Sequence, residues 1–231
     1  MVSGMADLIV TIDGPAASGK STAARLLAEK LGASFLDTGA MYRAVTLAAM
    51  QEGVDISNED KVLGVLDSRV LEFTSEAGRM TVLLDNVDIT ERIREAEVTA
   101  NAHYIASAGK LRDRLVKMQR QFVADEKKIV TEGRDQGTVA FPDADIKFYL
   151  TAKVVERALR RQAELRAKGS EQSLEQIQKA IEERDKRDES RAVGPLRPAG
   201  DAVVVDTTDL SVEEVVGKLL LCVKERCLRK K

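Results

Sequence analysis

The sequence has few of the residues on which several classes of protein depend. It contains no tryptophan, and aromatic residues make up only 3% of the chain, which argues against a platform that stacks the bases of a long single strand. Its two cysteines, Cys222 and Cys227, lack both zinc-ligand spacing and the number that a disulfide framework needs. We interpret them as packing residues in a reducing compartment, and therefore expect a cytoplasmic protein.

Charge and hydrophobic runs give no indication of binding to nucleic acid or membrane. The 36 lysines and arginines are balanced by 38 aspartates and glutamates, so no net positive charge would attract a polyanion. The longest apolar run near the N-terminus, residues 8–12, is interrupted by Thr11 and is too short for a signal sequence or a membrane span. We therefore expect no nucleic-acid or membrane partner.

Short apolar segments alternate along the chain with segments of helical periodicity. We predict strands at 8–12, 34–37, 127–131, 146–150 and 203–206, and helices at 18–31, 40–52, 94–124, 154–168, 173–189 and 212–228. A further helix should begin with Ser57 as its N-cap. Strands at 70–74, 79–84 and 87–90, separated by turn residues, indicate a small antiparallel insert. The alternation itself predicts an α/β fold with a parallel sheet, in one domain.

A phosphate-binding motif follows the first predicted strand. The segment GPAASGKS fits the P-loop pattern GxxxxGK[ST], with a strand before it and a helix after it. Its backbone N–H groups can turn inward as an anion-binding nest at a helix N-terminus. Lys20 would reach the β- and γ-phosphates of a nucleotide, and the Ser21 hydroxyl would hold Mg²⁺. The alternative is a plain glycine-rich turn, but such a turn would not require a lysine followed by a serine. We assign ATP binding to Gly14, Pro15, Ala16, Ala17, Ser18, Gly19, Lys20, Ser21 and Thr22.

Two later loops carry arginine where a second anion could bind. Arg43 lies one turn into the helix that follows Asp37 and Thr38 and could clamp a phosphate. The alternative is that Asp37 and Thr38 only cap that helix while Arg43 is solvated. In the segment 132–138, Arg134 suits a phosphate, and Asp135 could accept from the exocyclic amine of cytosine or adenine. A structural loop with a surface ion pair is the alternative there.

Two predicted helices are rich in charge. Arg157, Arg160 and Arg161 have i, i+3, i+4 spacing, which would aim three guanidiniums from one helix face at an anion, or else form a solvated basic surface. In the segment ERDKRDESRAVGP, four residues share a face at i, i+3, i+4 and i+7: Arg184, Arg187, Asp188 and Arg191. By itself this segment favours a solvent-exposed helix with internal ion pairs. Together with a P-loop and two loops that carry arginine, however, this face indicates one half of a pocket for a phosphate-bearing acceptor.

Four motifs together give the chain a specific resemblance. The segments TIDGPAASGKS, LDTGAMYR, EGRDQGTVAFPDA and ERDKRDESRAVGPL resemble those of bacterial cytidylate kinases, in the nucleoside-monophosphate (NMP) kinase superfamily of P-loop kinases. The resemblance spans residue 9 to about residue 216. It implies a P-loop NMP-kinase-like core with a parallel sheet flanked by helices, a small antiparallel insert in the NMP-binding region, and a helical lid. We expect one domain, 1–231, with its core at 6–36, 104–152 and 190–231, the NMP-binding region at about 37–103 and the lid at about 153–189.

The resemblance implies the ATP-dependent phosphorylation of CMP and dCMP to CDP and dCDP. By its motifs, the residues that bind CMP are Thr38, Tyr42, Arg43, Arg112, Arg134, Asp135, Arg184, Asp188 and Arg191. Arg43, Arg134 and Arg191 would hold the phosphate, and Arg184 and Asp188 the sugar. Thr38, Arg112 and Asp135 would lie at the cytosine, with Tyr42 near the nucleoside. The implied catalytic residues are Lys20, Arg134, Arg157, Arg161 and Arg191.

Two positions depart from the family pattern, and one stays unassigned. Thr38 stands where serine is also common in the family, so a hydroxyl group is kept. His103 stands where the family often has a small or hydroxyl-bearing residue that contacts the base, so a surface or packing role is the alternative for it. Arg187 is left open between the pocket and the surface.

The chemistry of the reaction sets what the protein must provide. The acceptor phosphate is already anionic near neutral pH, because its second pKa is about 6, so no general base is needed. We expect catalysis by positioning and charge neutralisation, with Mg²⁺ as cofactor, ATP and CMP or dCMP as substrates, and a monomer. Another small-acceptor kinase, for adenylate, uridylate or shikimate, and a nucleotide-binding regulator are the alternatives.

Overall fold

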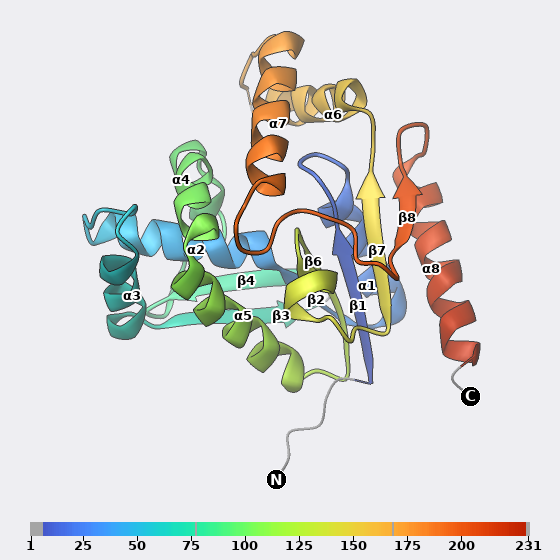
Figure 1. Ribbon diagram of the computed structural model, residues 1–231, viewed down its shortest axis with the longest axis horizontal. Coiled ribbons are helices and arrows are strands. Elements are labelled where there is room, and N and C mark those ends of the chain that lie inside the picture. Colours follow the sequence, from blue (N-terminus) through green and yellow to red (C-terminus); the bar gives the residue numbers. More distant parts are fainter. Residues whose placement is uncertain (1–6, 77, 168, 230–231) are drawn as a thin grey trace.

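The computed structural model describes residues 7–76, 78–167 and 169–229. Within these residues, one sheet has five strands: β1 (Leu8–Asp13), β2 (Ser34–Asp37), β6 (Lys128–Gly133), β7 (Ile146–Thr151) and β8 (Val203–Asp206). The strand order is β2-β6-β1-β7-β8, and all of the pairings are parallel. The α/β fold with a parallel sheet is therefore confirmed (Figure 1).

The central position of β1 follows from its composition. All six of its residues are buried, as expected for an uninterrupted β-branched and apolar strand that is covered on both faces of a parallel sheet. At its end, Asp13 lies opposite Gly133 of β6 and Tyr149 of β7. The carboxyl ends of these strands therefore meet at one edge, and the loops that follow them gather there, as ligand-binding loops do in open α/β sheets.

Helices surround the sheet. They are α1 (Lys20–Leu31), α2 (Thr38–Gln51), α3 (Glu59–Ser68), α4 (Ala96–Ser107), α5 (Gly109–Ala124), α6 (Val154–Ala167), α7 (Leu174–Glu189) and α8 (Val212–Arg229), with a short 3₁₀ turn η1 (Arg92–Arg94) and a π-helical turn η2 (Gln136–Ala140). Helix α1 packs on β1, β2, β6 and α8, behind the sheet in Figure 1. It ends at Gly32, whose φ of 57° is left-handed, as expected for a glycine C-cap.

The predicted antiparallel insert is present beside β2. It consists of β3 (Leu71–Glu76), β4 (Arg79–Leu84) and β5 (Val87–Asp88), in that order. The turn between β4 and β5 uses Asp85 and Asn86, both with positive φ, which matches the twist of a tight hairpin. Strand β5 is shorter than predicted because the Asp88 carboxylate accepts the N–H of Thr90 at 2.8 Å and turns the chain.

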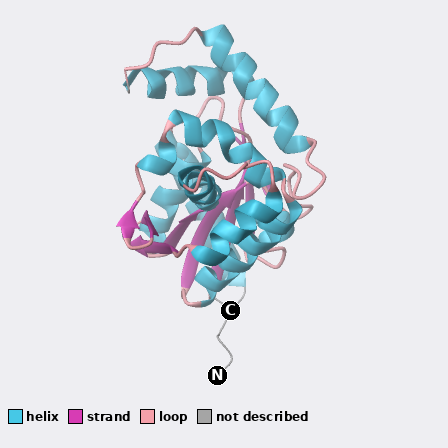
Figure 2. Cartoon of the chain, turned by 90° about the vertical axis from the view of Figure 1, so that its left-hand side faces the viewer, coloured by secondary structure: helices cyan, strands magenta, loops and turns pink. Residues whose placement is uncertain are grey.

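Helices α6 and α7 pack against each other and stand above the carboxyl edge of the sheet (Figures 1 and 2). A small apolar cluster between them, built on Ala158, Ile177 and Ile181, is separate from the main core. Ser173 opens α7 with a capping box, since its side chain accepts from the backbone of Gln176 while the Gln176 side chain accepts from the N–H of Ser173. We call this unit the α6–α7 pair.

Two of the sequence expectations are wrong. The single helix predicted over 94–124 is divided at Ala108, whose backbone is extended, because Glu59 of α3 accepts the N–H groups of Lys110 and Leu111 and so caps a new helix, α5. The N-cap of α3 is Asn58, not Ser57. Ser57 is instead held by the carboxylate of Asp55.

In the part of the chain that the structure describes, no helix is both long enough and apolar enough to cross a membrane.

Candidate functional site

The P-loop, residues 14–21, links β1 to α1 at the carboxyl edge of the sheet. A Cβ atom at Gly14 would collide with the carbonyl oxygen of Leu150, so glycine allows the loop to pass directly against β7. Ala17 and Gly19 have left-handed backbones, with φ of 57° and 84°. Gly19, Ser21 and Thr22 are exposed, which leaves the start of α1 open to a ligand.

Lys20 is buried in this open loop and has little to stabilise its charge. Its Nζ donates to the carbonyl oxygen of Pro15 at 3.1 Å. Burial, chiefly, together with the nearby charge of Arg134, lowers the pKa of Lys20 to about 7, although Glu132 opposes the shift. An anion bound beside Lys20 would favour its charged form.

The Ser21 hydroxyl faces a buried carboxylate at the end of β6. It donates to Glu132 Oε1 at 2.7 Å, and burial followed by the charge of Asp37 raises the pKa of Glu132. No group of three or more His, Cys, Asp or Glu side chains that could hold a metal occurs among the residues described. The protein thus offers Mg²⁺ one hydroxyl and one neighbouring carboxylate. This fits an ion that takes most of its ligands from water and nucleotide phosphates.

A group of arginines gathers around Asp188, on α7. Asp188 accepts a hydrogen bond from Arg134 Nε at 2.7 Å and another from Arg191. Burial alone would raise the pKa of Asp188, but these two guanidiniums outweigh it and hold the pKa below its usual value. We call Arg134, Arg184, Asp188 and Arg191 the arginine cluster.

Arg184 completes the cluster with an uncompensated charge. Its side chain is exposed and forms no ion pair with any residue that the structure describes. Even so, desolvation by the surrounding protein and the charge of Arg134 lower its pKa to about 10. The cluster therefore carries three guanidiniums for one carboxylate and would be stabilised by an anion.

A second buried pair lies beside the cluster. Arg112 on α5 forms an ion pair with Asp135, and only 2% of the Arg112 side chain is exposed. The guanidinium carbon of Arg112 lies 5.6 Å from the centre of the Tyr42 ring. The Nε atom of Arg112 is buried with no hydrogen-bond partner in the described part of the chain. Arg112 and Asp135, predicted at the cytosine, thus lie together with Tyr42, predicted near the nucleoside.

The segment at the end of β2 caps α2, as the alternative interpretation expected, but Arg43 is not solvated. Asp37 caps α2, since it accepts the N–H of Ala40 at 2.9 Å. Arg43 is not solvated, because its guanidinium donates to Asp37 at 3.2 Å and its side chain is 16% exposed. The buried Nε of Arg43 lacks a partner among the residues described. The Thr38 hydroxyl donates to the carbonyl oxygen of Glu132 at 2.7 Å.

The three arginines of α6 do not converge on one point. Arg157 is buried and donates to the carbonyl oxygens of Ala152 and Ala16. Arg160 donates to Thr207, in the loop after β8. Arg161 forms a half-exposed ion pair with Glu164 on its own helix. The helical spacing correctly predicted that all three arginines lie on α6. It did not predict that each guanidinium would bind a different group of the protein.

Several buried carboxylates at the site were missed by sequence reasoning. Asp185 contacts the P-loop and Arg157, and Asp13 accepts the N–H groups of Gln136 and Gly137 at 2.9 and 2.8 Å, which fixes the turn that carries Asp135. Burial raises the pKa of Asp13 to about 7. The sequence did contain a pattern that could have identified Asp185. The buried residues of α7 recur at helical spacing, and they are Ile177, Ile181, Asp185 and Asp188. The face of α7 that begins with two isoleucines therefore ends with two aspartates.

The structure also gives the positions of His103 and Arg187, the two residues whose roles the sequence left open. His103 is exposed on α4, where its Nδ1 lies 2.7 Å from the carbonyl oxygen of Ala100 and its ring lies 4.1 Å from that of Tyr104. This is the surface position that was the alternative for it. Arg187 is exposed on α7.

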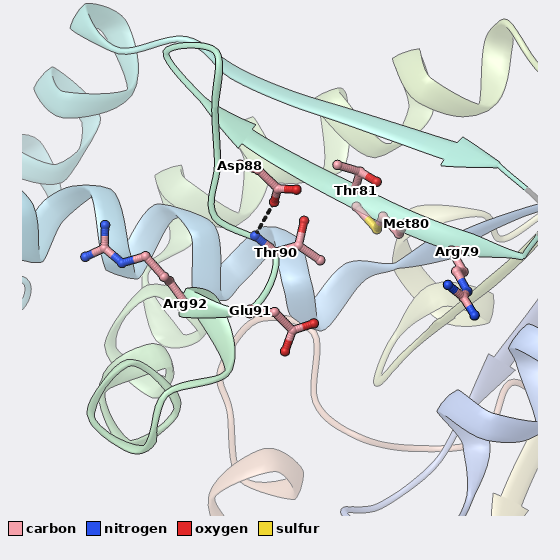
Figure 3. Close-up of a pocket in the computed structure, with 7 residues that line it drawn as sticks. All are labelled: Arg79, Met80, Thr81, Asp88, Thr90, Glu91 and Arg92. Atoms are coloured by element: carbon pink, nitrogen blue, oxygen red, sulfur yellow. Dashed lines mark hydrogen bonds between the residues drawn. The ribbon is translucent and has the colours of Figure 1, made fainter.

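The insert holds a hollow of its own, of about 350 Å³. Its lining residues are Arg79, Met80, Thr81, Asp88, Thr90, Glu91 and Arg92 (Figure 3). The four charged ones are exposed and of both signs, and Figure 3 shows Asp88 turned to the backbone of Thr90. Buried, unbalanced charge occurs instead at the carboxyl edge of the sheet, which makes that edge the candidate site.

Comparisons with known proteins indicate the family of the chain. The family model described as "Cytidylate kinase" matches residues 10–225. The chain is 44% identical to the cytidylate kinase of Leuconostoc mesenteroides over 215 residues, covering 93% of this chain and 96% of that one. It is 43% identical to the cytidylate kinase of Rhodococcus opacus over 219 residues, covering 95% and 96%. Among solved structures, a shikimate kinase from Bacteroides thetaiotaomicron is 13% identical with a TM-score of 0.47, covering 94% and 98%.

Proposed function

The chain belongs to the cytidylate kinase family, and we propose that it transfers the terminal phosphoryl group of ATP to CMP or dCMP, which gives ADP and CDP or dCDP. One observation carries the proposal: a P-loop and a cluster of unbalanced guanidiniums share one edge of the sheet. The charges of Arg134 and Arg184 both act on Lys20 of the P-loop. Two anionic groups bound at these places would therefore be neighbours.

The donor nucleotide would lie on the P-loop. Residues 14–22 would surround its phosphates with backbone N–H groups, and Lys20 would neutralise charge on the β- and γ-phosphates. Ser21 would hold Mg²⁺, with Glu132 fixing the direction of the hydroxyl. When bound, Mg²⁺ would supply charge neutralisation and help to orient the terminal phosphate.

The acceptor would lie between the arginine cluster and the buried Arg112–Asp135 pair. Arg134, Arg191 and Arg43 would hold the phosphate. Arg184 and Asp188 would bind the sugar. Asp135 would accept from the amino group of cytosine, which is a donor that uracil lacks. Arg112, Tyr42 and Thr38 would complete the base site.

Transfer would then depend on alignment and charge. A phosphate oxygen of the acceptor attacks the terminal phosphorus of ATP in line with the leaving oxygen, with no side chain needed as a base. Lys20, Arg134 and Arg191 would stabilise the equatorial oxygens. Arg157 would contribute from the P-loop side, where it already contacts the carbonyl oxygen of Ala16, and Arg161 on closure of the α6–α7 pair.

The remaining assignments extend the proposal. We propose one domain over 1–231 with its core at 6–36, 104–152 and 190–231, an NMP-binding region at about 37–103, and a lid at about 153–189. The apolar cluster that α6 and α7 share supports treating the two helices as one structural unit of that lid. We further propose a monomer that works in the cytoplasm.

A coupled ADP-release assay with CMP, dCMP, UMP, AMP and shikimate tests the function. Highest kcat/KM with CMP or dCMP is expected. Highest activity with UMP, AMP or shikimate would identify a different small-acceptor kinase. ATP binding without turnover of any acceptor would indicate a nucleotide-binding regulator instead.

A further inference from the structure

The P-loop residue Ala16 is tied through its backbone to both helices of the α6–α7 pair. Its N–H donates to Asp185 Oδ1 at 3.3 Å, and its carbonyl oxygen accepts from Arg157 at 3.0 Å. Arg157 and Asp185 are joined by an ion pair of 2.5 Å. All three residues are buried, so water competes little for these bonds. We call Ala16, Arg157 and Asp185 the Ala16 triangle.

The neighbouring P-loop residue adds an apolar contact to the same helices. Ala17 packs against the small cluster of Ala158, Ile177 and Ile181 between α6 and α7. Its left-handed backbone, with φ of 57°, is one that a side-chain-bearing residue adopts only when its surroundings hold it. The conformation of the P-loop and the position of the α6–α7 pair are therefore mechanically linked.

Helix α7 carries a second carboxylate three residues after Asp185. Asp185 and Asp188 lie on the same, buried face of the helix. Asp188 accepts hydrogen bonds from Arg134 and Arg191 of the arginine cluster. Less than one helical turn thus separates a carboxylate bound to the P-loop from a carboxylate bound to the cluster.

We propose that Asp185 is a positioning residue that couples the donor and acceptor halves of the site. Nucleotide phosphates would order the P-loop, the Ala16 triangle would hold α7, and Asp188 would then present Arg134 and Arg191 to the acceptor. The inference rests on the proposed function, because it assumes a nucleotide on the P-loop and a monophosphate at the cluster. Each ligand must then tighten the binding of the other by the same factor.

Asp185→Asn tests this coupling, because it keeps the shape of the side chain but removes the charge that holds Arg157. Titration calorimetry measures the Kd of CMP with and without a saturating non-hydrolysable ATP analogue and Mg²⁺. In the wild type, the analogue should tighten CMP binding by about fivefold or more, as is typical of coupled sites. In Asp185→Asn, the two Kd values should agree within about twofold. Glu183→Gln, which changes an exposed carboxylate on the same helix, should keep the wild-type ratio.

The ratio of the two Kd values distinguishes coupling from a structural role. A residue needed only for folding would lower the melting temperature and weaken both affinities alike. An undiminished ratio in Asp185→Asn, or a ratio near one in the wild type, overturns the inference while leaving the proposed function intact. Absence of any CMP turnover by the wild type defeats the proposed function instead. Should Asp185→Asn fail to fold, Asp185→Glu displaces the carboxylate by one methylene and must likewise lower the ratio.

Discussion

The Ser21 hydroxyl donates a hydrogen bond of 2.7 Å to Glu132 Oε1, which joins the first turn of α1 to the end of β6. The two residues are 111 positions apart in the sequence. They meet because β6 pairs directly with β1, in a register that places Glu132 opposite Ile12, one residue before the end of β1. A buried carboxylate thereby fixes the direction of the hydroxyl that we assign to Mg²⁺.

Glu132→Gln should make the reaction more dependent on Mg²⁺. The variant keeps the size of the side chain but weakens its hold on Ser21, so the Mg²⁺ concentration for half-maximal ADP release should rise by about 10–100-fold. Glu126→Gln is a matched control, because it alters another serine–glutamate bond, of 2.5 Å, to Ser34 at the start of β2. An unchanged Mg²⁺ dependence in Glu132→Gln would contradict the assignment.

The parts of the fold that depend on contiguous residues could be predicted from the sequence. The strand at 8–12, the P-loop and the helix that ends before Gly32 follow one another directly, so local pattern suffices for them. The break at Ala108 could not be predicted, because the group that caps α5 is Glu59, from a helix about 50 residues earlier. The sequence pattern within one helix gives no information about a capping residue that belongs to a different helix.

The same limit applies to the candidate site. Helical spacing put Arg184, Arg187, Asp188 and Arg191 on one face, but α7 ends at Glu189, so Arg191 lies beyond the helix, and Arg187 stays exposed. The spacing also could not show that Asp185 turns to the P-loop. It also placed Arg157, Arg160 and Arg161 on one helix but not with their separate partners. Residue types and helical spacing show which groups can face one way. The partner on the opposite element decides what each of them does.

Arg134→Ala should lower kcat/KM for CMP by about 10²–10³-fold, the cost of removing one preorganised donor from a developing charge. The variant also leaves Asp188 without its 2.7 Å partner. Arg187→Ala removes the same charge from an exposed position on α7 and should stay within about twofold of the wild type. Steady-state kinetics with varied CMP at saturating ATP gives both values. Equal losses in the two variants would contradict the assignment of the acceptor to the arginine cluster, because Arg187 lies outside that cluster.

Asp135→Ala should destabilise the fold as well as abolish selection of cytosine. Removal of the carboxylate leaves Arg112 buried without its counter-charge, at a cost of about 3–5 kcal/mol in the free energy of unfolding measured with urea. The double variant Arg112→Met/Asp135→Leu should recover much of this stability without regaining CMP turnover. As a control, Asp60→Ala breaks the exposed pair with Lys110 and should leave the urea midpoint almost unchanged. A midpoint in Asp135→Ala equal to that of the wild type would be evidence against the buried pair.

Lys20→Ala should abolish phosphoryl transfer without unfolding the protein. Because burial disfavours the charge of Lys20, its removal should leave the melting temperature unchanged or slightly higher. Lys147 of β7 is a second buried lysine among the residues described, and it is paired at 2.9 Å with Asp201, which precedes β8. Lys147→Ala should show the opposite pattern, with a lower melting temperature and retained transfer. Near-normal turnover in Lys20→Ala would refute the P-loop assignment.

Binding of ATP should draw a proton from solution at pH 8. Burial, chiefly, and Arg134 lower the pKa of free Lys20 to about 7, so at pH 8 only about one Lys20 in ten is protonated. The triphosphate favours the charged form and raises this pKa, so binding should take up nearly one proton per site. Calorimetric titration of ATP in Tris and in HEPES, whose ionisation enthalpies differ, gives the number of protons from the difference in heat. Lys20→Arg, whose charge is permanent, should bind without uptake. Wild-type heats that are independent of the buffer at pH 8 would mean that Lys20 is already charged before the phosphates arrive.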